Sequence, residues 1–259
     1  MTMTFYKYQG TGNDFIIVDN RLQQIDKNDT KRIEELCDRR FGIGADGFIL
    51  LENDKNSDFK MVYYNADGNE SSMCGNGGRC IVAFAKYLGV IKNTTEFIAI
   101  DGLHKAKIES DIVYLQMQDV STIESYDNHL FLDTGSPHHV EMVSGLDNFD
   151  VKSIGSKIRY GHPYNEAGSN VNFVEQLADD TFGVRTYERG VEDETLSCGT
   201  GVTAVALAMH NSGKTKGKEV NLKTLGGQLV VAFNSDGSSY NNIWLIGPAQ
   251  QVFKGDLVW

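Results

Sequence analysis

The sequence predicts a mixed α/β protein made of two halves of similar build, each with a central helix wrapped by strands. Two observations support this prediction. Most of the chain consists of short runs of β-branched and aromatic residues separated by turn residues, which is typical of strands. Residues 75–88 and 199–209 break this pattern, because they are rich in alanine and apolar on nearly all sides, as buried helices are.

The two apolar segments begin in the same way. Cys74-Gly75-Asn76-Gly77 opens the first, and Cys198-Gly199-Thr200-Gly201 opens the second, 124 residues further along. Because this offset is close to half of the 259 residues, we expect a duplicated architecture. We expect one half at 1–119 and the other at 120–249, with a C-terminal strand at 250–259 that returns to the first half.

The other elements follow from local patterns in chain order. Residues 30–41 have apolar residues at helical spacing, begin after the candidate N-cap Asp29 and end at Gly42. The apolar stripe of this helix consists of Ile33, Leu36, Cys37 and Phe41. Residues 234–242 are too few to link domains and predict a hairpin loop. The predicted strands are 15–18, 48–51, 61–64, 112–117, 182–187, 229–233 and 243–246.

The composition argues against several classes of function. The chain has 24 Lys+Arg against 35 Asp+Glu, a formal net charge of −11, and short basic clusters, so we expect no nucleic-acid partner. No stretch approaches the roughly 18 apolar residues of a membrane span, and the first residues lack the apolar core of a signal peptide. We therefore expect a cytoplasmic protein with no membrane partner. Its 4 cysteines are too few for a disulfide scaffold.

A cysteine at the start of a helix has particular chemistry. It lies among unpaired backbone N–H groups at the positive end of the helix dipole, which favours the thiolate and lowers the thiol pKa. The same N–H groups, with glycines that allow close approach, suit a carboxylate. Two such cysteines, Cys74 and Cys198, suit inversion of a carbon centre across an interdomain cleft. One thiolate removes an α-proton and the opposite thiol protonates the other face, which requires no cofactor and no metal.

Other interpretations of the cysteines are weaker. A single helix start of this kind more often serves packing, but its duplication favours chemistry. A metal site is disfavoured by the C-x5-C spacing of Cys74 and Cys80 and by the lack of a partner cysteine in the second copy, so Cys80 is expected to be buried and apolar. A phosphatase-like loop would need H-C-x5-R, whereas Arg79 gives C-x4-R, and no arginine follows Cys198.

Five motifs occur in order along nearly the whole chain. They are Gly12-Asn13-Asp14-Phe15, residues 65–70 leading to 73–80, Gly135-Ser136-Pro137-His138, Asn170-Val171-Asn172-Phe173, and residues 187–190 leading to 198–201. In this combination they resemble the diaminopimelate epimerase family. The resemblance implies a cofactor-independent epimerase that interconverts LL- and meso-diaminopimelate in the synthesis of lysine and cell-wall precursors. It also implies an α/β (α+β) fold of two pseudo-symmetric halves, each a curved sheet around a central helix, and a homodimer.

The resemblance also implies residue roles. It makes Cys74 and Cys198 the acid/base pair and assigns the reacting carboxylate to the amides of Gly75, Asn76, Gly199 and Thr200. The rest of this small amino-acid substrate would be held by Asn13, Asn65, Asn172, Glu188 and Arg189. Arg189 suits the distal carboxylate, because its guanidinium can donate two parallel hydrogen bonds to it. Glu188 suits an ammonium group, because its carboxylate carries the opposite charge. His138 and Glu188 match positions that adjust the pKa values of the two thiols.

Three departures from the family pattern concern the distal end of the substrate. Gly47 stands where many members have Gln, and Ser136 stands where many have Asn. The loop at 191–195 is one residue longer and more acidic than the common version. These changes leave both cysteines intact, so they bear on the identity of the substrate rather than on the type of reaction.

Two rival functions remain open at this point. A proline or hydroxyproline racemase would share the paired cysteines, but it usually has Cys-Gly-His-Gly where this chain has Asn76. Its ring substrate also offers no distal carboxylate to Arg189. A non-catalytic amino-acid-binding protein would need only amides and side-chain contacts, so the presence of both cysteines argues against it.

Overall fold

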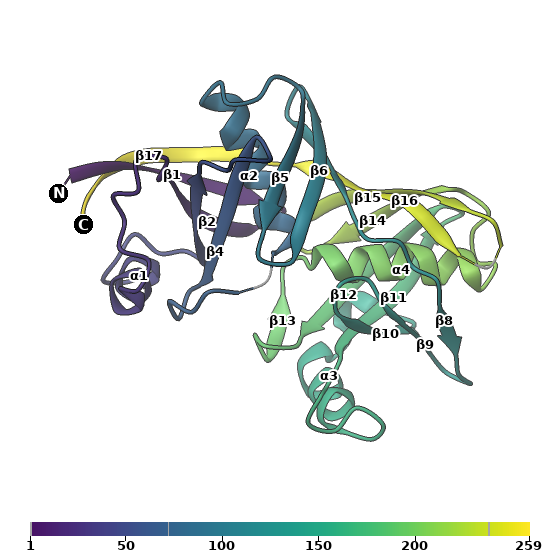
Figure 1. Ribbon diagram of the computed structural model, residues 1–259. Helices are drawn as coiled ribbons and strands as arrows, with labels where there is room; N and C mark the ends of the chain where they lie inside the picture. The colour runs from purple at the N-terminus through teal and green to yellow at the C-terminus, as the bar shows by residue number, and fades with distance from the viewer. Residues whose placement is uncertain (1, 72, 238) are drawn as a thin grey trace. The chain divides into compact units, whose positions relative to one another are not determined.

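The computed structural model describes residues 2–71, 73–237 and 239–259. The chain forms two compact units (Figure 1). Unit 1 consists of the chain up to Leu115 together with Gly247–Trp259, and unit 2 consists of Gln116–Ile246. The mixed α/β class predicted from the sequence is confirmed, whereas the predicted domain limits after residues 119 and 249 stay a prediction. Among the helices of the described residues, none combines the length and the hydropathy that a membrane span requires.

Unit 1 is built around α2 (Gly75–Tyr87), which is buried over most of its length and contacts strands on several sides. Antiparallel pairs join β1 to β17, β1 to β2, β3 to β4, β5 to β6 and β6 to β7, and parallel pairs join β2 to β3 and β4 to β5. The strands are β1 (Thr2–Gly10), β2 (Asn13–Asp19), β3 (Gly47–Glu52), β4 (Phe59–Asn65), β5 (Thr94–Ala99), β6 (Gly102–Glu109), β7 (Ile112–Gln116) and β17 (Gln250–Val258).

Unit 2 is built in the same way around α4 (Gly199–Asn211). Antiparallel pairs join β8 to β9, β9 to β10, β11 to β12, β12 to β13, β14 to β15 and β15 to β16, and parallel pairs join β10 to β11 and β12 to β14. The strands are β8 (Ile123–Ser125), β9 (Leu130–Asp133), β10 (Pro137–Met142), β11 (Asn170–Ala178), β12 (Thr181–Glu188), β13 (Asp193–Thr195), β14 (Glu219–Thr224), β15 (Gly227–Ser235) and β16 (Tyr240–Pro248).

The duplication extends to the order in which parallel and antiparallel strand pairs follow one another along the chain. From β1 to β6 the pairs run antiparallel, parallel, antiparallel, parallel, antiparallel, and the same order runs through β9, β10, β11, β12, β14 and β15. In both units a short helix, α1 (Thr30–Cys37) or α3 (Val151–Tyr160), follows the second of these strands, and the buried helix follows the fourth. The two halves predicted from the repeated helix starts therefore share one architecture.

The first predicted helix is shorter than expected. Helix α1 begins after Asp29, whose side chain accepts a hydrogen bond from Arg32 N, but it ends at Cys37 rather than at residue 41. The Asp38 carboxylate accepts hydrogen bonds from the N–H groups of Arg40 and Phe41, both at 2.7 Å, and this local turn replaces the next helical turn. The prediction that Phe41 lies on the buried stripe is wrong, because Phe41 is 93% exposed.

Helix α3 was not predicted from the sequence. Asp150 caps it by accepting a hydrogen bond from Ser153 N, and Gly155 lies in its interior. A Cβ atom at Gly155 would lie 2.4 Å from Cβ of Tyr187, so only glycine allows this helix to pack against β12. The glycine that permits the packing also lowers the helix propensity of the segment, which is why the sequence gives a weak signal.

The remaining predictions agree with the structure. The helices predicted at 75–88 and 199–209 correspond to α2 and α4, and each predicted strand lies in a strand of the structure or overlaps one. The hairpin predicted around 234–242 is confirmed by the pairing of Ser235 with Tyr240, although residue 238 lies outside the described residues. The C-terminal strand β17 pairs with β1 along most of its length.

Candidate active site

Cys74 is the N-cap residue of α2. Its backbone is extended, with φ −91° and ψ 129°, and its carbonyl accepts a hydrogen bond from Gly78 N at 2.7 Å. The amides of Gly75 and Asn76 therefore lie in the first turn, where helical N–H groups point out of the helix end. A Cβ atom at Gly78 would lie 2.9 Å from Sδ of Met73, so this glycine allows the helix start to pack closely.

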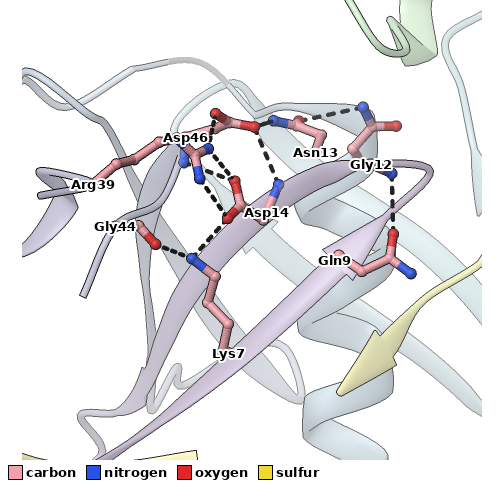
Figure 2. A network of polar contacts seen from close by, with 9 residues as sticks. Lys7, Gln9, Gly12, Asn13, Asp14, Arg39, Gly44 and Asp46 are labelled. Atoms are coloured by element: carbon pink, nitrogen blue, oxygen red, sulfur yellow. Dashed lines mark hydrogen bonds and ion pairs between the residues drawn. The ribbon is translucent and has the colours of Figure 1, made fainter. Parts of the chain in front are cut away.

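Asn13, the first residue of β2, contacts this helix start. Its Oδ1 accepts hydrogen bonds from Cys74 Sγ at 3.5 Å and from Asn76 Nδ2 at 3.3 Å. Its Nδ2 donates to Asp46 Oδ2 at 2.6 Å (Figure 2). Because the carboxylate of Asp46 can only accept, it fixes the amide so that the oxygen of Asn13 faces Cys74.

A network of charges holds Asp46 and its neighbours in place (Figure 2). Arg39 donates to Asp46 Oδ1 and to Asp14 Oδ1, each at 2.6 Å, and Lys7 Nζ lies 2.7 Å from Asp14 Oδ2. Lys7 also donates to the carbonyl of Gly44. Burial raises the pKa of Asp14, but the hydrogen bonds from Arg39 and Lys7 outweigh burial and bring it down to about 2. Sequence reasoning missed Asp46, because its contact with Asn13 joins residues far apart in the chain.

The remaining candidate residues of unit 1, Asn65 and Gly47, lie opposite each other where β4 ends and β3 begins. Asn65 is exposed there, and its carbonyl accepts a hydrogen bond from Gly68 N at 3.0 Å. Asn65 pairs in register with Gly47 on β3. A Cβ atom at Gly47 would lie 2.5 Å from Cε2 of Tyr63, so the local packing accounts for glycine at this position.

Cys198 is the N-cap residue of α4 and has the same extended backbone, with φ −117° and ψ 114°. It is 6% exposed. Its Sγ lies 3.4 Å from Oγ1 of Thr200, and its carbonyl accepts a hydrogen bond from Val202 N at 2.9 Å. A Cβ atom at Gly201 would lie 3.3 Å from this sulfur, so the glycine leaves room for it.

A chain of polar groups leads from Cys198 to His138. Oγ1 of Thr200 lies 3.4 Å from Oγ of Ser136, which lies 3.0 Å from Nε2 of His138. Asn172 Nδ2 donates to His138 Nδ1 at 3.1 Å, so the imidazole carries its proton on Nε2 and donates it to Ser136. Burial lowers the pKa of His138 to about 3, so the ring is neutral near pH 7.

The direction of these hydrogen bonds follows from their neighbours. Oγ of Ser136 accepts from His138 and also from Asn170 Nδ2 at 3.1 Å, so its own proton points to Thr200. Thr200 then has its hydroxyl proton available for the sulfur of Cys198. Ser136, which stands where many family members have Asn, is thus the link between the histidine and the helix start.

Asn172 is fully buried, and its amide is held on both sides. Its Oδ1 accepts from Thr186 Oγ1 at 2.9 Å, and its Nδ2 donates to the carbonyl of His139 at 3.0 Å as well as to His138. Sequence reasoning did not single out Thr186, which fixes the orientation of this amide.

Glu188 and Arg189 lie at the end of β12. Oε2 of Glu188 accepts a hydrogen bond from Thr195 Oγ1 at 2.9 Å. The backbone N–H of Arg189 donates to Asn170 Oδ1 at 2.9 Å, and its exposed side chain donates to the carbonyl of Ala167 at 3.0 Å. These contacts hold the end of β12 and leave the Arg189 side chain on the surface of unit 2.

The acidic loop after Arg189 is tied down by ion pairs within unit 2. Each of its carboxylates has a cationic partner: Glu192 pairs with Arg159 at 3.1 Å, Asp193 with Lys152 at 2.5 Å, and Glu194 with Arg185 at 2.6 Å. The added acidity of this loop therefore has a structural explanation. Among the residues that the structure describes, no group of three or more His, Cys, Asp and Glu side chains could hold a metal ion.

Comparisons with known proteins agree with the motifs. The sequence model of diaminopimelate epimerase matches residues 5–122 and 130–252. The diaminopimelate epimerase of Flavobacterium psychrophilum is 62% identical over 253 residues, which cover 97% of this chain and 99% of that protein. The diaminopimelate epimerase of Chlorobaculum tepidum is 42% identical over 258 residues, which cover 96% of this chain and 98% of that protein.

Solved structures share the fold at low sequence identity. A PhzF-family phenazine biosynthesis protein of Bacillus anthracis matches with a TM-score of 0.80 and 12% identity over 100% of both chains. A hydroxyproline epimerase of Agrobacterium vitis matches with a TM-score of 0.68 and 16% identity over 99% of this chain and 92% of that one. The predicted fold of two pseudo-symmetric halves is confirmed.

Proposed function

This chain belongs to the diaminopimelate epimerase family, and we propose that Cys74 and Cys198 are the two bases of its reaction. It is an isomerase that interconverts LL- and meso-diaminopimelate, a reaction of lysine biosynthesis. The reaction inverts one α-carbon, so a proton leaves one face and another arrives at the opposite face. Two groups of the same kind, each able to gain and lose a proton, satisfy this requirement in both directions.

The observation that supports this proposal is the repeated placement of a cysteine as the N-cap of a buried helix. At both Cys74 and Cys198 the first-turn amides and the helix dipole favour negative charge. One thiolate takes the α-proton, and the electron pair moves onto the substrate carboxylate. The amides of Gly75, Asn76, Gly199 and Thr200 stabilise the charge on that carboxylate. The other thiol then donates its proton to the α-carbon, which restores one thiol and one thiolate.

The surrounding residues have more varied tasks. We assign the distal carboxylate to Arg189 and the distal ammonium group to Glu188, because their charges suit these groups. Asn13 and Asn65 lie at strand ends of unit 1 and complete the proposed substrate contacts. Because Asn172 is fully buried, we assign it a positioning role through His138 rather than direct contact with the substrate.

A homodimer and a cytoplasmic location are part of the same proposal. All four cysteines are free, which suits a reducing compartment. Exposed apolar side chains on β17, including Val252 and Phe253, suit a contact between two copies of the chain. Light scattering of the purified protein measures the oligomeric state.

The reaction in deuterated water tests the proposed mechanism. With LL-diaminopimelate as substrate, deuterium should enter the meso product faster than the remaining substrate, because the second thiol has already exchanged with solvent. Retention of the substrate hydrogen in the inverted product during one turnover would point to a single base. L-Proline should not be racemised. Binding of diaminopimelate with no exchange at the α-carbon would favour the non-catalytic binding protein.

A further inference from the structure

Arg79 is a fully buried arginine in α2, five residues after Cys74. Its guanidinium donates to the carbonyl of Gly75 at 3.3 Å, to Asn76 Oδ1 at 3.0 Å and to Thr11 Oγ1 at 3.0 Å, and its Nε donates to the carbonyl of Pro248 at 3.5 Å. Every one of these acceptors is neutral. Within residues 2–71, 73–237 and 239–259, the buried charge of Arg79 has no carboxylate partner.

This arrangement differs from the other cations of low exposure. Burying a charge without a counter-ion is costly, so such a charge is expected to serve a purpose. Burial lowers the pKa of Arg79, but a guanidinium stays protonated at neutral pH. Three less completely buried cations pair with carboxylates: Lys7 with Asp14, Arg159 with Glu192 and Arg185 with Glu194.

The charge lies close behind the first cysteine. Asn76 links the two, because its Oδ1 accepts from Arg79 and its Nδ2 donates to Asn13 Oδ1, which also accepts from Cys74 Sγ. Gly10 allows the guanidinium to approach, since a Cβ atom there would lie 3.3 Å from Arg79 Nη2. The charged forms of Cys80 and Cys74 both raise the pKa of Arg79, Cys80 more strongly. Burial raises the pKa of the Cys80 thiol to about 12, so near neutral pH it is the thiolate of Cys74 that this Coulomb energy favours.

The equivalent position in unit 2 carries no charge. Thr203 follows Cys198 by five residues, is fully buried, and donates through Oγ1 to the carbonyl of Gly199 at 2.9 Å. Arg79 makes the same contact with the carbonyl of Gly75. The helix start therefore needs a donor at this position but not a charge, and the charge is a feature of unit 1.

We propose that Arg79 is a positioning residue whose buried charge allows Cys74 to become a thiolate. A difference between two neighbours of the sulfurs supports this proposal. Asn13 presents an amide oxygen, which accepts a hydrogen bond from the thiol and so favours the thiol form of Cys74, whereas Thr200 can donate a hydrogen bond to the thiolate of Cys198. The proposal rests on the proposed function, in which Cys74 must gain and lose a proton.

The pH dependence of alkylation tests this proposal on the full-length protein. Iodoacetamide labelling of each cysteine is followed by mass spectrometry in the wild type, in Arg79→Met, in Arg79→Lys and in Thr203→Val as the matched control. In Arg79→Met the midpoint of the pH profile of Cys74 labelling should move up by at least about one pH unit. Below that midpoint, this shift lowers the thiolate fraction about tenfold. Arg79→Lys should keep the wild-type profile of Cys74. Labelling of Cys198 should be unchanged in all three variants.

Equal profiles of Cys74 in Arg79→Met and Arg79→Lys would show that the charge is irrelevant and would overturn the proposal. If Arg79→Met fails to fold by circular dichroism, Arg79→Gln replaces it. If neither neutral variant folds while Arg79→Lys does, the charge serves folding and the proposal is also overturned. The labelling needs no substrate, so failure of the wild type to epimerise diaminopimelate would reject the proposed function without deciding the role of Arg79.

Discussion

The two helix starts hold their cysteines in the same backbone conformation but surround them with different polar groups. In unit 1 the sulfur of Cys74 donates to the amide oxygen of Asn13. Charged groups follow in the same hydrogen-bond network, because Asn13 contacts Asp46 directly and contacts Arg79 through Asn76. In unit 2 the sulfur of Cys198 lies beside the hydroxyl of Thr200, and Ser136 and the neutral imidazole of His138 follow behind it. The duplication therefore preserved the helix start and allowed the side chains around it to diverge.

This difference matches the demands of the reaction. The two thiols perform opposite steps in each direction, so each needs to be stable both with and without its proton. Unit 2 supports the thiolate by a hydroxyl donor, and under our proposal unit 1 supports it by the buried charge of Arg79. Similar proton affinities can thus arise from different groups, and equivalent positions need not carry equivalent residues.

The largest expected effect comes from removing either sulfur. Cys74→Ala and Cys198→Ala should each lower epimerisation by roughly a thousandfold or more, because proton transfer by a positioned group contributes about 10²- to 10⁴-fold. Each variant should still exchange the α-proton of one stereoisomer, and the two variants should differ in which one. Proton NMR in deuterated water measures both exchange rates.

Cys37→Ala is a suitable control for the two sulfur variants. Cys37 lies in α1, and burial raises the pKa of its thiol to about 12, so it is not expected to react. Its removal should leave epimerisation near the wild-type rate. If both active-site variants exchanged the same stereoisomer, the two cysteines could not serve opposite faces.

A smaller effect is expected at Arg189, which belongs to unit 2 alone. Arg189→Ala would leave the distal carboxylate of the substrate unpaired, which costs on the order of 2 to 5 kcal/mol. The ratio kcat/KM should then fall by about 30-fold or more. The labelling profiles of both cysteines should stay unchanged, because the backbone contact of Arg189 with Asn170 remains. Unchanged kinetics would mean that the distal carboxylate binds elsewhere.

The parts predicted from the sequence are those encoded by local patterns. The starts of α2 and α4 were predicted because a cysteine and two glycines open an apolar, alanine-rich run in both. The end of α1 was predicted wrongly because the side chain of Asp38 competes with the helical hydrogen bonds. Helix α3 was missed because Gly155 weakens its pattern, and the packing that requires this glycine involves Tyr187 on another element.

The supporting residues of the site could not be predicted in this way. Asp46 orients Asn13 across 33 positions of sequence, and Thr186 orients Asn172 from the neighbouring strand. The sequence includes Arg79 in the motif at 73–80 and in a phosphatase-like spacing but assigns it no role, because its burial and its neutral partners depend on the packing of α2. Such roles arise from contacts between elements, whereas motifs describe neighbours in the chain.

The smallest effect concerns acid stability, which should differ between the two units. Burial lowers the pKa of both His138 and His139 to about 3, against about 6.5 in the unfolded chain. Between these values the unfolded state binds protons that the folded state does not, so the free energy of unfolding falls as the pH falls. Lowering the pH from 6.5 to 5.5 should cost unit 2 about 1 kcal/mol for each of these two histidines.

Unit 1 should resist the same change. The pKa of Asp14 is about 2 in the folded state, so its stabilising contribution is complete above about 3.8 and is lost only as the pH falls from there towards 2. The two tryptophans report on the units separately, since Trp259 belongs to unit 1 and Trp244 to unit 2. Urea unfolding of Trp259→Phe, followed by the fluorescence of Trp244, should show the loss at pH 5.5, and His139→Gln should reduce it by about 1 kcal/mol. An equal loss reported by Trp259 in Trp244→Phe would mean that the acid sensitivity does not come from His138 and His139, the two buried histidines of unit 2.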